Sequence, residues 1–355
     1  MSAPTTPAPV GRRDPAPDSA PAPTTETMTM AQALNAALAD ELAGDESVVL
    51  IGEDIGTLGG VFRITDGLKT RFGGERVIDA PLAESGIVGT AIGMAYAGQR
   101  PVCEIQFDGF VYPAFDQIVS QASRLRYRTG GLVAMPLTIR IPFGGGIGAV
   151  EHHSESPEAY FAHTPGLRVV TVADPQDAYS TLRAAIRSED PVIFLEPKRR
   201  YWGKGEVDRT LRADLDSARV LRPGRDATLV AYGPLVLTAL EAAVAAEDDG
   251  IDLEVIDLRS LAPLDRATVA ASVRRTGRLV VTHEAPGTVS LAAEVITSAI
   301  EDCFDHLEAA PERVTGYDIP YPPSALEEHH LPGIDRILDA VDRTLGRRHS
   351  REVRA

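Results

Sequence analysis

Glu84 is the residue of this sequence best placed to do proton chemistry. It opens a segment, residues 84–98, that is predicted to be a helix and carries no other charged residue. Gly89, Gly93 and Ala97 recur at every fourth position, so one face of this helix is bare backbone on which another helix can pack closely. A carboxylate in the first turn of a helix is favoured by the helix dipole, which is the simplest explanation for Glu84.

The apolar character of this helix indicates a second role for the acid. A helix without a polar side is expected to be buried on all sides, and the acid at its start would be buried with it. A buried carboxylate is costly unless a partner gives or takes a proton. We therefore predict that Glu84 is held at a subunit or domain seam for proton transfer.

Other polar and glycine-rich segments also follow predicted strands. Glu53 and Asp54 come directly after the apolar residues 48–51, and a glycine-rich loop at residues 142–148 follows another apolar run. Ligands of open parallel sheets bind at the carboxyl ends of the strands, so both segments are well placed. The loop lacks the spacing of a dinucleotide-binding motif, and we interpret its glycines as allowing close approach to a ligand or a partner chain.

His152 and His153 offer a second acid–base group near neutral pH. Adjacent side chains on an extended segment point in opposite directions, so we do not expect this pair to share a metal ion. The residue types leave open whether either histidine is functional, and His163 and residues 329–330 are interpreted as structural or surface histidines. Phe110 lies in an aromatic cluster that fits either core packing or a wall for a flat ring.

Strands and helices alternate at short spacing along the chain, which predicts an α/β fold with two parallel-sheet domains. Strands are expected at residues 48–51, 76–78, 101–105, 137–141, 168–172, 192–196, 227–231, 253–257 and 278–282. Helices are expected at residues 28–46, 65–72, 84–98, 112–126, 175–188, 234–246, 265–274, 289–303 and 334–345. The predicted organisation is a disordered proline- and alanine-rich head at 1–27, a first domain at 28–202, a charged, irregular linker at 203–225 and a second domain at 226–350.

The composition describes a soluble globular protein. A chain of 355 residues can form two domains, and its net charge of −16 without a Lys/Arg run argues against nucleic acid or an anionic membrane as partner. Cys103 and Cys303 form no ligand pattern and are expected to be free thiols in a reducing compartment. The head has no apolar signal region and no apolar run could span a membrane, so a cytoplasmic protein is predicted.

Six segments together resemble the β subunit of a thiamine-diphosphate-dependent 2-oxoacid dehydrogenase, the decarboxylating first component of the pyruvate and branched-chain complexes. They are GED at 52–54, PLAESGIVGTAIG at 81–93, EIQFDGFVYPAFDQIVSQASRLRYRTGG at 104–131, HHSES at 152–156, LEVIDLRSLAPLD at 253–265 and RTGRLVVTHEAP at 275–286. The resemblance covers residues 28–347 and is closest to the branched-chain type. It implies a transketolase-like pyrimidine-binding domain followed by a transketolase C-terminal-like domain.

The resemblance implies roles for four of the residues singled out above. Glu84 matches the carboxyl group that bonds the pyrimidine ring nitrogen of the cofactor and serves as acid and base. Glu53 matches a second acid near the same ring, and Phe110 an aromatic residue that packs on it. His153 matches a histidine near the thiazolium that binds the oxoacid or protonates an intermediate.

The resemblance also implies a structural potassium ion in some relatives. The positions that match its ligands are Leu137, Thr138, Ala185, Ser188 and Asp190. Ser188 stands where an aspartate is common in the family.

One motif of the family is absent from this sequence. The chain has no GDG motif, which in this group precedes the asparagines that hold magnesium on the diphosphate. The resemblance therefore implies an α subunit that carries magnesium, a heterotetramer of two α and two β chains, and a lipoyl acyltransferase docked on the second domain. Glu308 and Glu312 match acidic positions for that docking.

The predicted function is oxidative decarboxylation of a branched-chain 2-oxoacid, with acyl transfer to lipoamide in a multienzyme complex. Pyruvate or acetoin dehydrogenase is the near alternative, and a non-catalytic docking subunit is the alternative from another class. A self-sufficient transketolase-like enzyme is not expected, because the chain is too short and lacks the phosphate motif.

Overall fold

The computed structural model describes residues 25–347 of the chain. The predicted disordered head lies almost wholly outside these residues. Its last residues, from Thr25 on, belong to a strand, β1 (Thr25–Thr29), which pairs antiparallel with β8 (Lys204–Asp208).

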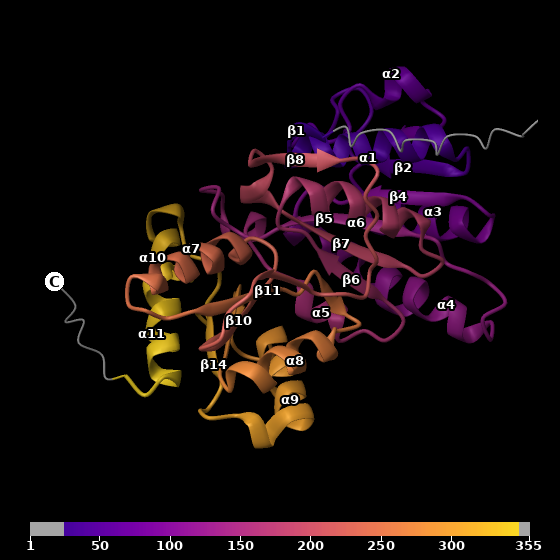
Figure 1. The fold of residues 1–355 in the computed structure, drawn as a ribbon. Helices are drawn as coiled ribbons and strands as arrows, with labels where there is room; N and C mark the ends of the chain where they lie inside the picture. Colours follow the sequence, from indigo (N-terminus) through magenta and orange to yellow (C-terminus); the bar gives the residue numbers. More distant parts are fainter. Residues whose placement is uncertain (1–24, 348–355) are drawn as a thin grey trace, which may run out of the picture.

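The larger of two main sheets has seven strands in the order β12-β6-β7-β5-β4-β2-β3 (Figure 1). Its strands are β2 (Val48–Gly52), β3 (Val77–Asp79), β4 (Arg100–Glu104), β5 (Thr138–Phe143), β6 (Arg168–Thr171), β7 (Val192–Pro197) and β12 (Ser260–Ala262). All neighbours in it are parallel except β12, an edge strand contributed by the second half of the chain. The apolar runs that predicted these strands are buried on both faces, as in other parallel sheets.

The smaller sheet has five strands in the order β14-β13-β10-β11-β9. Its strands are β9 (Arg219–Arg222), β10 (Ala227–Ala231), β11 (Leu253–Asp257), β13 (Leu279–Pro286) and β14 (Glu312–Gly316). Only β9 runs antiparallel to its neighbour. Two parallel-type sheets covered by helices confirm the predicted α/β class.

The segment 203–225 is not irregular, as the sequence analysis expected, because it contains β8 and β9. Both are edge strands in which every residue except Val207 is exposed or half-buried. Their charged side chains therefore face solvent, and the apolar run that reveals a buried strand is missing.

The helices cover both faces of the two sheets. They are α1 (Met30–Gly44), α2 (Leu68–Phe72), α3 (Glu84–Tyr96), α4 (Ser123–Arg128), α5 (Glu158–Ala162), α6 (Pro175–Arg187), α7 (Leu235–Glu247), α8 (Arg266–Thr276), α9 (Leu291–Cys303), α10 (Glu327–His330) and α11 (Ile334–Thr344). On the larger sheet, α1 and α6 cover one face and α3 the other. On the smaller sheet, α7 and α11 cover one face and α8 and α9 the other.

The predicted single helix at 112–126 is three consecutive helical segments. A 3-10 helix, η1 (Asp108–Ala114), leads into a π-helical stretch, η2 (Gln117–Ala122), and then into α4. Pro113 lies within η1, where its ring cannot donate the hydrogen bond that a regular α-helix needs. The helical segment therefore begins at Asp108, nearer to the end of β4 than the predicted start at residue 112.

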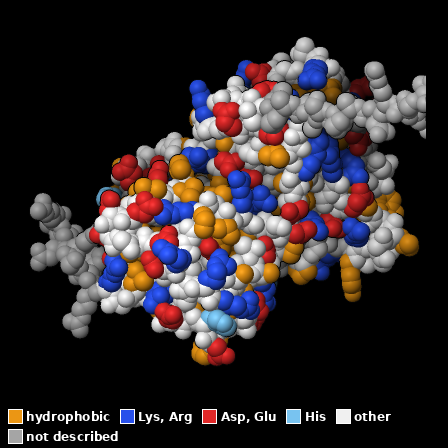
Figure 2. All heavy atoms as spheres, viewed as in Figure 1, with side chains coloured by type: hydrophobic (Ala, Val, Ile, Leu, Met, Phe, Trp, Pro, Cys, Tyr) orange, Lys and Arg blue, Asp and Glu red, His pale blue; other side chains and the backbone are white. Residues whose placement is uncertain are grey.

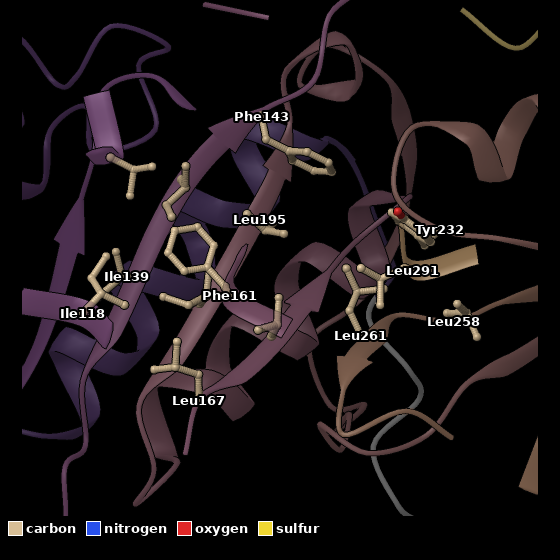
Figure 3. Packing of buried hydrophobic residues seen from close by; sticks show 14 of the residues in the cluster. Ile118, Ile139, Phe143, Phe161, Leu167, Leu195, Tyr232, Leu258, Leu261 and Leu291 are labelled. Atoms are coloured by element: carbon tan, nitrogen blue, oxygen red, sulfur yellow. The ribbon is translucent and has the colours of Figure 1, made fainter. Parts of the chain in front are cut away.

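The two halves of the chain share one apolar core. Figure 3 shows Phe143 and Leu195 of the larger sheet packed in the same cluster as Tyr232, Leu258 and Leu291 of the second half. A shared core of this kind resists separation of the halves, because separation would expose large apolar side chains. The second half therefore helps to fix the carboxyl edge of the larger sheet.

Both cysteines are free and buried, as predicted. Among the described residues, no helix has the length and apolar character required to cross a membrane.

A buried ion-pair cluster ties three neighbouring strands together where their carboxyl ends begin. Arg140 on β5 donates to Glu104 on β4 at 2.6 Å and to Glu196 on β7 at 2.6 and 2.9 Å. The Tyr201 hydroxyl donates to the same Glu196 carboxylate at 2.7 Å. Arg140 is 1% exposed and Glu196 fully buried, so each charge depends on its partner for the solvation that water would otherwise give.

Replacing Arg140 with methionine should lower the free energy of unfolding by roughly 3–5 kcal/mol, because two buried carboxylates lose their shared guanidinium. Chemical denaturation of the full chain measures this loss. The control is Arg126→Met, which breaks a half-exposed pair with Asp190 and should cost no more than about 1 kcal/mol. Equal losses in the two variants would contradict the central role given to Arg140.

Candidate active site

The structure brings the predicted acids Glu53 and Glu84 together at the carboxyl edge of the larger sheet. Strands β2 and β3 are register neighbours, with Gly52 opposite Asp79. Glu53 follows the first of these strands, and Glu84 begins α3 after the second. Burial and the nearby charges of Asp54 and Glu84 raise the pKa of Glu53 above its ordinary value.

Glu84 is buried and lacks a donor. The residue is 7% exposed, and no residue in the described part of the chain donates a hydrogen bond to its carboxylate or forms an ion pair with it. Neither carboxylate oxygen is among the fully buried side-chain atoms that lack a partner in the described chain, so the carboxylate remains accessible from outside the chain. The carboxylate is therefore suited to a donor that comes from outside this chain.

The loop after β2 is tied to β3, which fixes the direction of both acids. The Asp79 carboxylate accepts hydrogen bonds from the backbone nitrogen of Gly56 at 2.5 Å and from Lys69 at 2.7 Å. A Cβ atom on Gly56 would lie 2.3 Å from the Asp79 carboxylate, so only glycine fits there. The backbone nitrogen of Ala80 donates to Gly52 at 2.8 Å and holds the two strand ends side by side.

Helix α3 is not buried on all sides within this chain, which corrects the sequence expectation. Ile87, Val88 and Ala91 pack on the core, whereas Gly93 and Tyr96 are exposed. Nothing among the described residues lies within 4 Å of where a Cβ of Gly93 would be. Because α3 has little charge on any side, the sequence alone does not show which side of the helix packs against its own chain.

The sequence analysis expected His152 and His153 to point in opposite directions on an extended segment. This expectation is wrong, because the segment is a short 3-10 helix, η3 (Glu151–His153). Their ring centroids lie 4.3 Å apart. His153 stacks on Phe107 with centroids 3.9 Å apart and meets Phe110 edge-on at 5.1 Å. Partial burial lowers the pKa of His153. The imidazole is therefore neutral at pH 7 and can accept a proton.

Helix η3 lies against η1, and a glycine sets their separation. A Cβ on Gly109 would lie 2.2 Å from the carbonyl oxygen of His152. Helix α3 packs against η1 as well, so η1 links the helix that begins with Glu84 to the segment that carries His153. The predicted residues Glu84, Phe110 and His153 thus belong to α3, η1 and η3, of which η1 packs against the other two.

Residues beneath His153 escaped the sequence analysis as functional candidates. Phe107 was noted only as part of an aromatic cluster, and the buried pair Asp108–Lys198 was not noted at all. The two charged residues lie 90 positions apart, so no local pattern joins them.

The glycine-rich loop at 142–148 packs against the second half of its own chain. The backbone nitrogen of Gly145 donates to Glu284, and that of Gly146 donates to Glu327 at 2.6 Å. A Cβ on Gly145 would overlap the Tyr321 hydroxyl. These nitrogens are taken by carboxylates, which agrees with rejecting a phosphate-binding role for the loop.

The residues predicted to hold potassium are engaged with one another and with arginines. The Asp190 carboxylate pairs with Arg126 at 2.5 Å and with Arg168 at 3.5 Å. The backbone oxygen of Ser188 accepts from the guanidinium of Arg100 at 3.2 Å. No group of His, Cys, Asp or Glu side chains in residues 25–347 is arranged to hold a metal ion. Arginine side chains already supply positive charge at these positions.

The two glutamates predicted to dock the acyltransferase are each paired within the chain. Glu308 pairs with Arg278 at 2.6 Å, and Glu312 with Arg343 at 3.0 Å. Figure 2 shows acidic and basic side chains intermingled over the face of the molecule that it presents. A basic partner at these glutamates would have to compete with the chain's own arginines.

Known families and proteins match almost the whole described chain. The pattern of the family described as "Transketolase, pyrimidine binding domain" matches residues 26–203, and that of "Transketolase, C-terminal domain" matches residues 216–337. A solved structure titled "Split gene transketolase, inactive beta4 tetramer" superposes with a TM-score of 0.76 over 91% of this chain and 99% of that chain, at 24% identity. The chain therefore has the fold of a transketolase-like protein.

Curated relatives narrow this class. "Pyruvate dehydrogenase E1 component subunit beta" of Leifsonia xyli is 56% identical over 92% of this chain and 97% of its own length. "3-methyl-2-oxobutanoate dehydrogenase subunit beta" of Mycobacterium tuberculosis is 55% identical over 90% and 93%, and "2-oxoisovalerate dehydrogenase subunit beta" of Pseudomonas aeruginosa is 47% identical over 91% and 97%. The chain belongs to the family of β subunits of the 2-oxoacid dehydrogenase first component.

Replacing Gly109 with alanine should displace η3, because the new methyl group collides with the backbone of His152. The stack of His153 on Phe107 should be lost, at a cost of about 1–3 kcal/mol in the free energy of unfolding. Nuclear magnetic resonance of the histidine ring protons detects the loss of ring-current shift from Phe107.

Gly44→Ala is the matched control for this change, since nothing lies within 4 Å of a Cβ at Gly44. It should leave the His153 signals in place. An unchanged His153 signal in the Gly109 variant would show that this glycine does not set the position of η3.

Proposed function

We propose that this chain supplies the proton-handling side of a thiamine-diphosphate site in a heterotetramer of two α and two β chains. The observation that carries the proposal is Glu84, a residue that is 7% exposed and whose accessible carboxylate has no donor within the described chain. The protonated ring nitrogen of an aminopyrimidine is a donor of the required kind. The match to a pyrimidine-binding family over residues 26–203 supports this choice of partner.

Thiamine diphosphate, when bound, supplies the nucleophilic carbon that adds to the keto group of a 2-oxoacid. This chain's part is to handle protons around it. Glu84 holds a proton at the pyrimidine nitrogen and serves as general acid and base. Glu53, whose pKa is raised by burial and by the charges of Asp54 and Glu84, retains a proton more readily than an ordinary glutamate and can share it with Glu84. Phe110 offers an apolar wall to the ring.

His153 is proposed to face the oxoacid. Nδ1 of its neutral imidazole donates to the backbone oxygen of His152 at 3.1 Å, which leaves Nε2 free to accept a proton. Because partial burial lowers its pKa, this form persists at pH 7. Its ring is held by Phe107 and Phe110, so its orientation is set before substrate arrives.

An α subunit is proposed to complete the site. This chain has no GDG motif for the diphosphate, so magnesium is assigned to that partner. The open glycine face of α3 around Gly93 offers a surface for close helix packing next to Glu84. The acyl group is then proposed to pass to lipoamide on an acyltransferase that docks near Glu308 and Glu312.

Potassium is not part of the proposal. Arg126 and Arg168 pair with the carboxylate of Asp190, and Arg100 with the backbone oxygen of Ser188. A potassium ion would have to share these oxygens with guanidinium groups, so we assign the stabilising charge to the arginines.

A non-catalytic docking subunit is the competing function. Such a subunit has no need for a carboxylate that is accessible at the edge of the sheet, lacks a donor in the described chain and lies beside Glu53, and this arrangement favours the catalytic role.

Replacing Glu84 with glutamine should abolish decarboxylation while leaving assembly with α intact. General acid–base catalysis by one side chain is worth about 10²–10⁴-fold, so turnover of the reconstituted pair should fall by at least about a hundredfold. Release of carbon dioxide from a 2-oxoacid measures it, and gel filtration measures assembly.

Glu75→Gln, which neutralises an exposed glutamate on the approach to β3, is the control and should turn over normally. Wild-type turnover in the Glu84 variant would reject the role of this residue. Absence of turnover in the wild-type pair would favour the docking subunit instead.

The branched-chain 2-oxoacid is the proposed substrate, with pyruvate the alternative and acetoin a more distant one. Two relatives named for branched-chain oxoacids are 55% and 47% identical, and one named for pyruvate is 56% identical. The reconstituted pair should show its highest kcat/KM on 3-methyl-2-oxobutanoate in a panel that includes pyruvate and acetoin. One methylene in an apolar pocket is worth about 10–200-fold, which makes the preference measurable. A higher kcat/KM on pyruvate would instead assign the chain to the pyruvate dehydrogenase type.

A further inference from the structure

Asp108 and Lys198 form an ion pair deep beneath the segment that carries His153. Both side chains are fully buried, and the Lys198 ammonium contacts Oδ1 of Asp108. Burial raises the pKa of Asp108 to about 6 and lowers the pKa of Lys198, which means that keeping either side chain charged in this position costs free energy. A fully buried pair is weak support for stability, since apolar residues of similar volume often serve as well. Its position therefore invites another explanation.

The pair is joined to His153 along two routes. Oδ2 of Asp108 accepts a hydrogen bond from the backbone nitrogen of Glu155, two residues beyond His153. The Lys198 ammonium lies 5.8 Å from the ring centroid of Phe107, and the ring of His153 stacks on that same phenylalanine at 3.9 Å. The carboxylate thus holds the backbone of the segment, and the ammonium lies beside the ring on which the imidazole rests.

Several other groups also face His153. From its own segment come the ring of His152, the backbone oxygen of His152, which accepts from Nδ1 of His153 at 3.1 Å, and the carboxylate of Glu151. His152 and Glu151 are exposed, so solvent and salt weaken their fields. Lys198 lies in low-dielectric surroundings, where a charge acts more strongly. A protonated His153 would place a second positive charge beside Phe107, near this ammonium.

We propose that the Asp108–Lys198 pair is a positioning element for His153, anchoring its backbone through the carboxylate and keeping its imidazole neutral through the ammonium. This inference rests on the proposed catalytic role of His153 only for its consequence in turnover. Its physical content, a coupling between a buried charge and a ring across Phe107, holds whether or not the assembled enzyme uses 2-oxoacids.

The two charges predict opposite effects, which a merely structural role would not produce. Lys198→Met removes the positive charge and should raise the pKa of His153. Asp108→Asn leaves the Lys198 ammonium without its counter-charge and should lower the pKa of His153. Titration of histidine ring signals by nuclear magnetic resonance on the full-length chain measures both, with His153→Gln used to assign the signal. Lys198→Arg keeps the charge and should keep the wild-type value.

In the complex with the α subunit, the acidic limb of the plot of kcat/KM against pH should shift in the same directions as the pKa of His153. It should move to higher pH in Lys198→Met and to lower pH in Asp108→Asn, and turnover at pH 7 should fall about twofold in the first, which is the loss expected when half of the imidazole is protonated. Arg183→Met breaks a partly buried pair with Glu41, between α1 and α6, and should leave the profile unmoved.

The double variant Asp108→Asn with Lys198→Met leaves no buried charge unpaired and guards against misfolding of either single variant. It should retain a folded chain and raise the pKa of His153. The proposal is overturned if the His153 titration is the same in folded Lys198→Met, Asp108→Asn and the double variant as in wild type. Lack of oxoacid turnover in the wild-type pair would instead reject the proposed function, because the titration needs no substrate.

Discussion

The guanidinium of Arg140 is the interaction on which the working edge of the molecule depends. It joins β4, β5 and β7 through carboxylates that are nearly or wholly buried. Parallel strands that are apolar on both faces specify their mutual register weakly, since sliding by two residues still buries apolar side chains. A buried ion pair between register partners Glu104 and Arg140 removes that freedom. The strand ends from which the site segments depart are therefore aligned.

The second half of the chain stabilises this edge from outside the sheet. Tyr232 donates to Glu158 at 2.7 Å across the shared core, and burial raises the pKa of Glu158 to about 7. The glycine-rich loop also links the two halves. The backbone nitrogen of Gly144 donates to the backbone oxygen of Glu155, and that of Gly145 donates to the carboxylate of Glu284 in the second half. The segment after His153 is thus held between the two halves. A movement of one half against the other would disturb the histidine.

What could be predicted from the sequence depended on how local the determining interactions are. Apolar runs such as residues 48–51 and 192–195 revealed the buried parallel strands, because burial on both faces leaves a continuous signal. Edge strands β8 and β9 and the short β12 gave no such signal. The fold class and the neighbouring positions of Glu53 and Glu84 followed from the rule that parallel strands place their carboxyl ends on one edge.

The parts of the site that escaped prediction depend on contacts between distant segments. The turn at η3 follows from its packing on Gly109, and the pairing of Asp108 with Lys198 follows from the meeting of the segments after β4 and β7. Pairings of this kind are set by tertiary structure, so neither spacing nor periodicity records them. The family resemblance pointed to His153, but it did not indicate what lies beneath it.

Two features of α3 have one explanation. Its first residue is largely buried but presents an accessible carboxylate without a donor in the described chain, and its glycine face around Gly93 has no cover there. Either feature alone is compatible with a stable fold. Their occurrence on one helix, next to a second carboxylate with a raised pKa, indicates that the helix is finished by material outside this chain. A partner that packs on the glycine face can bring a ligand to the carboxylate in the same step. In the function proposed above, assembly with a partner and completion of the acid–base site are a single event.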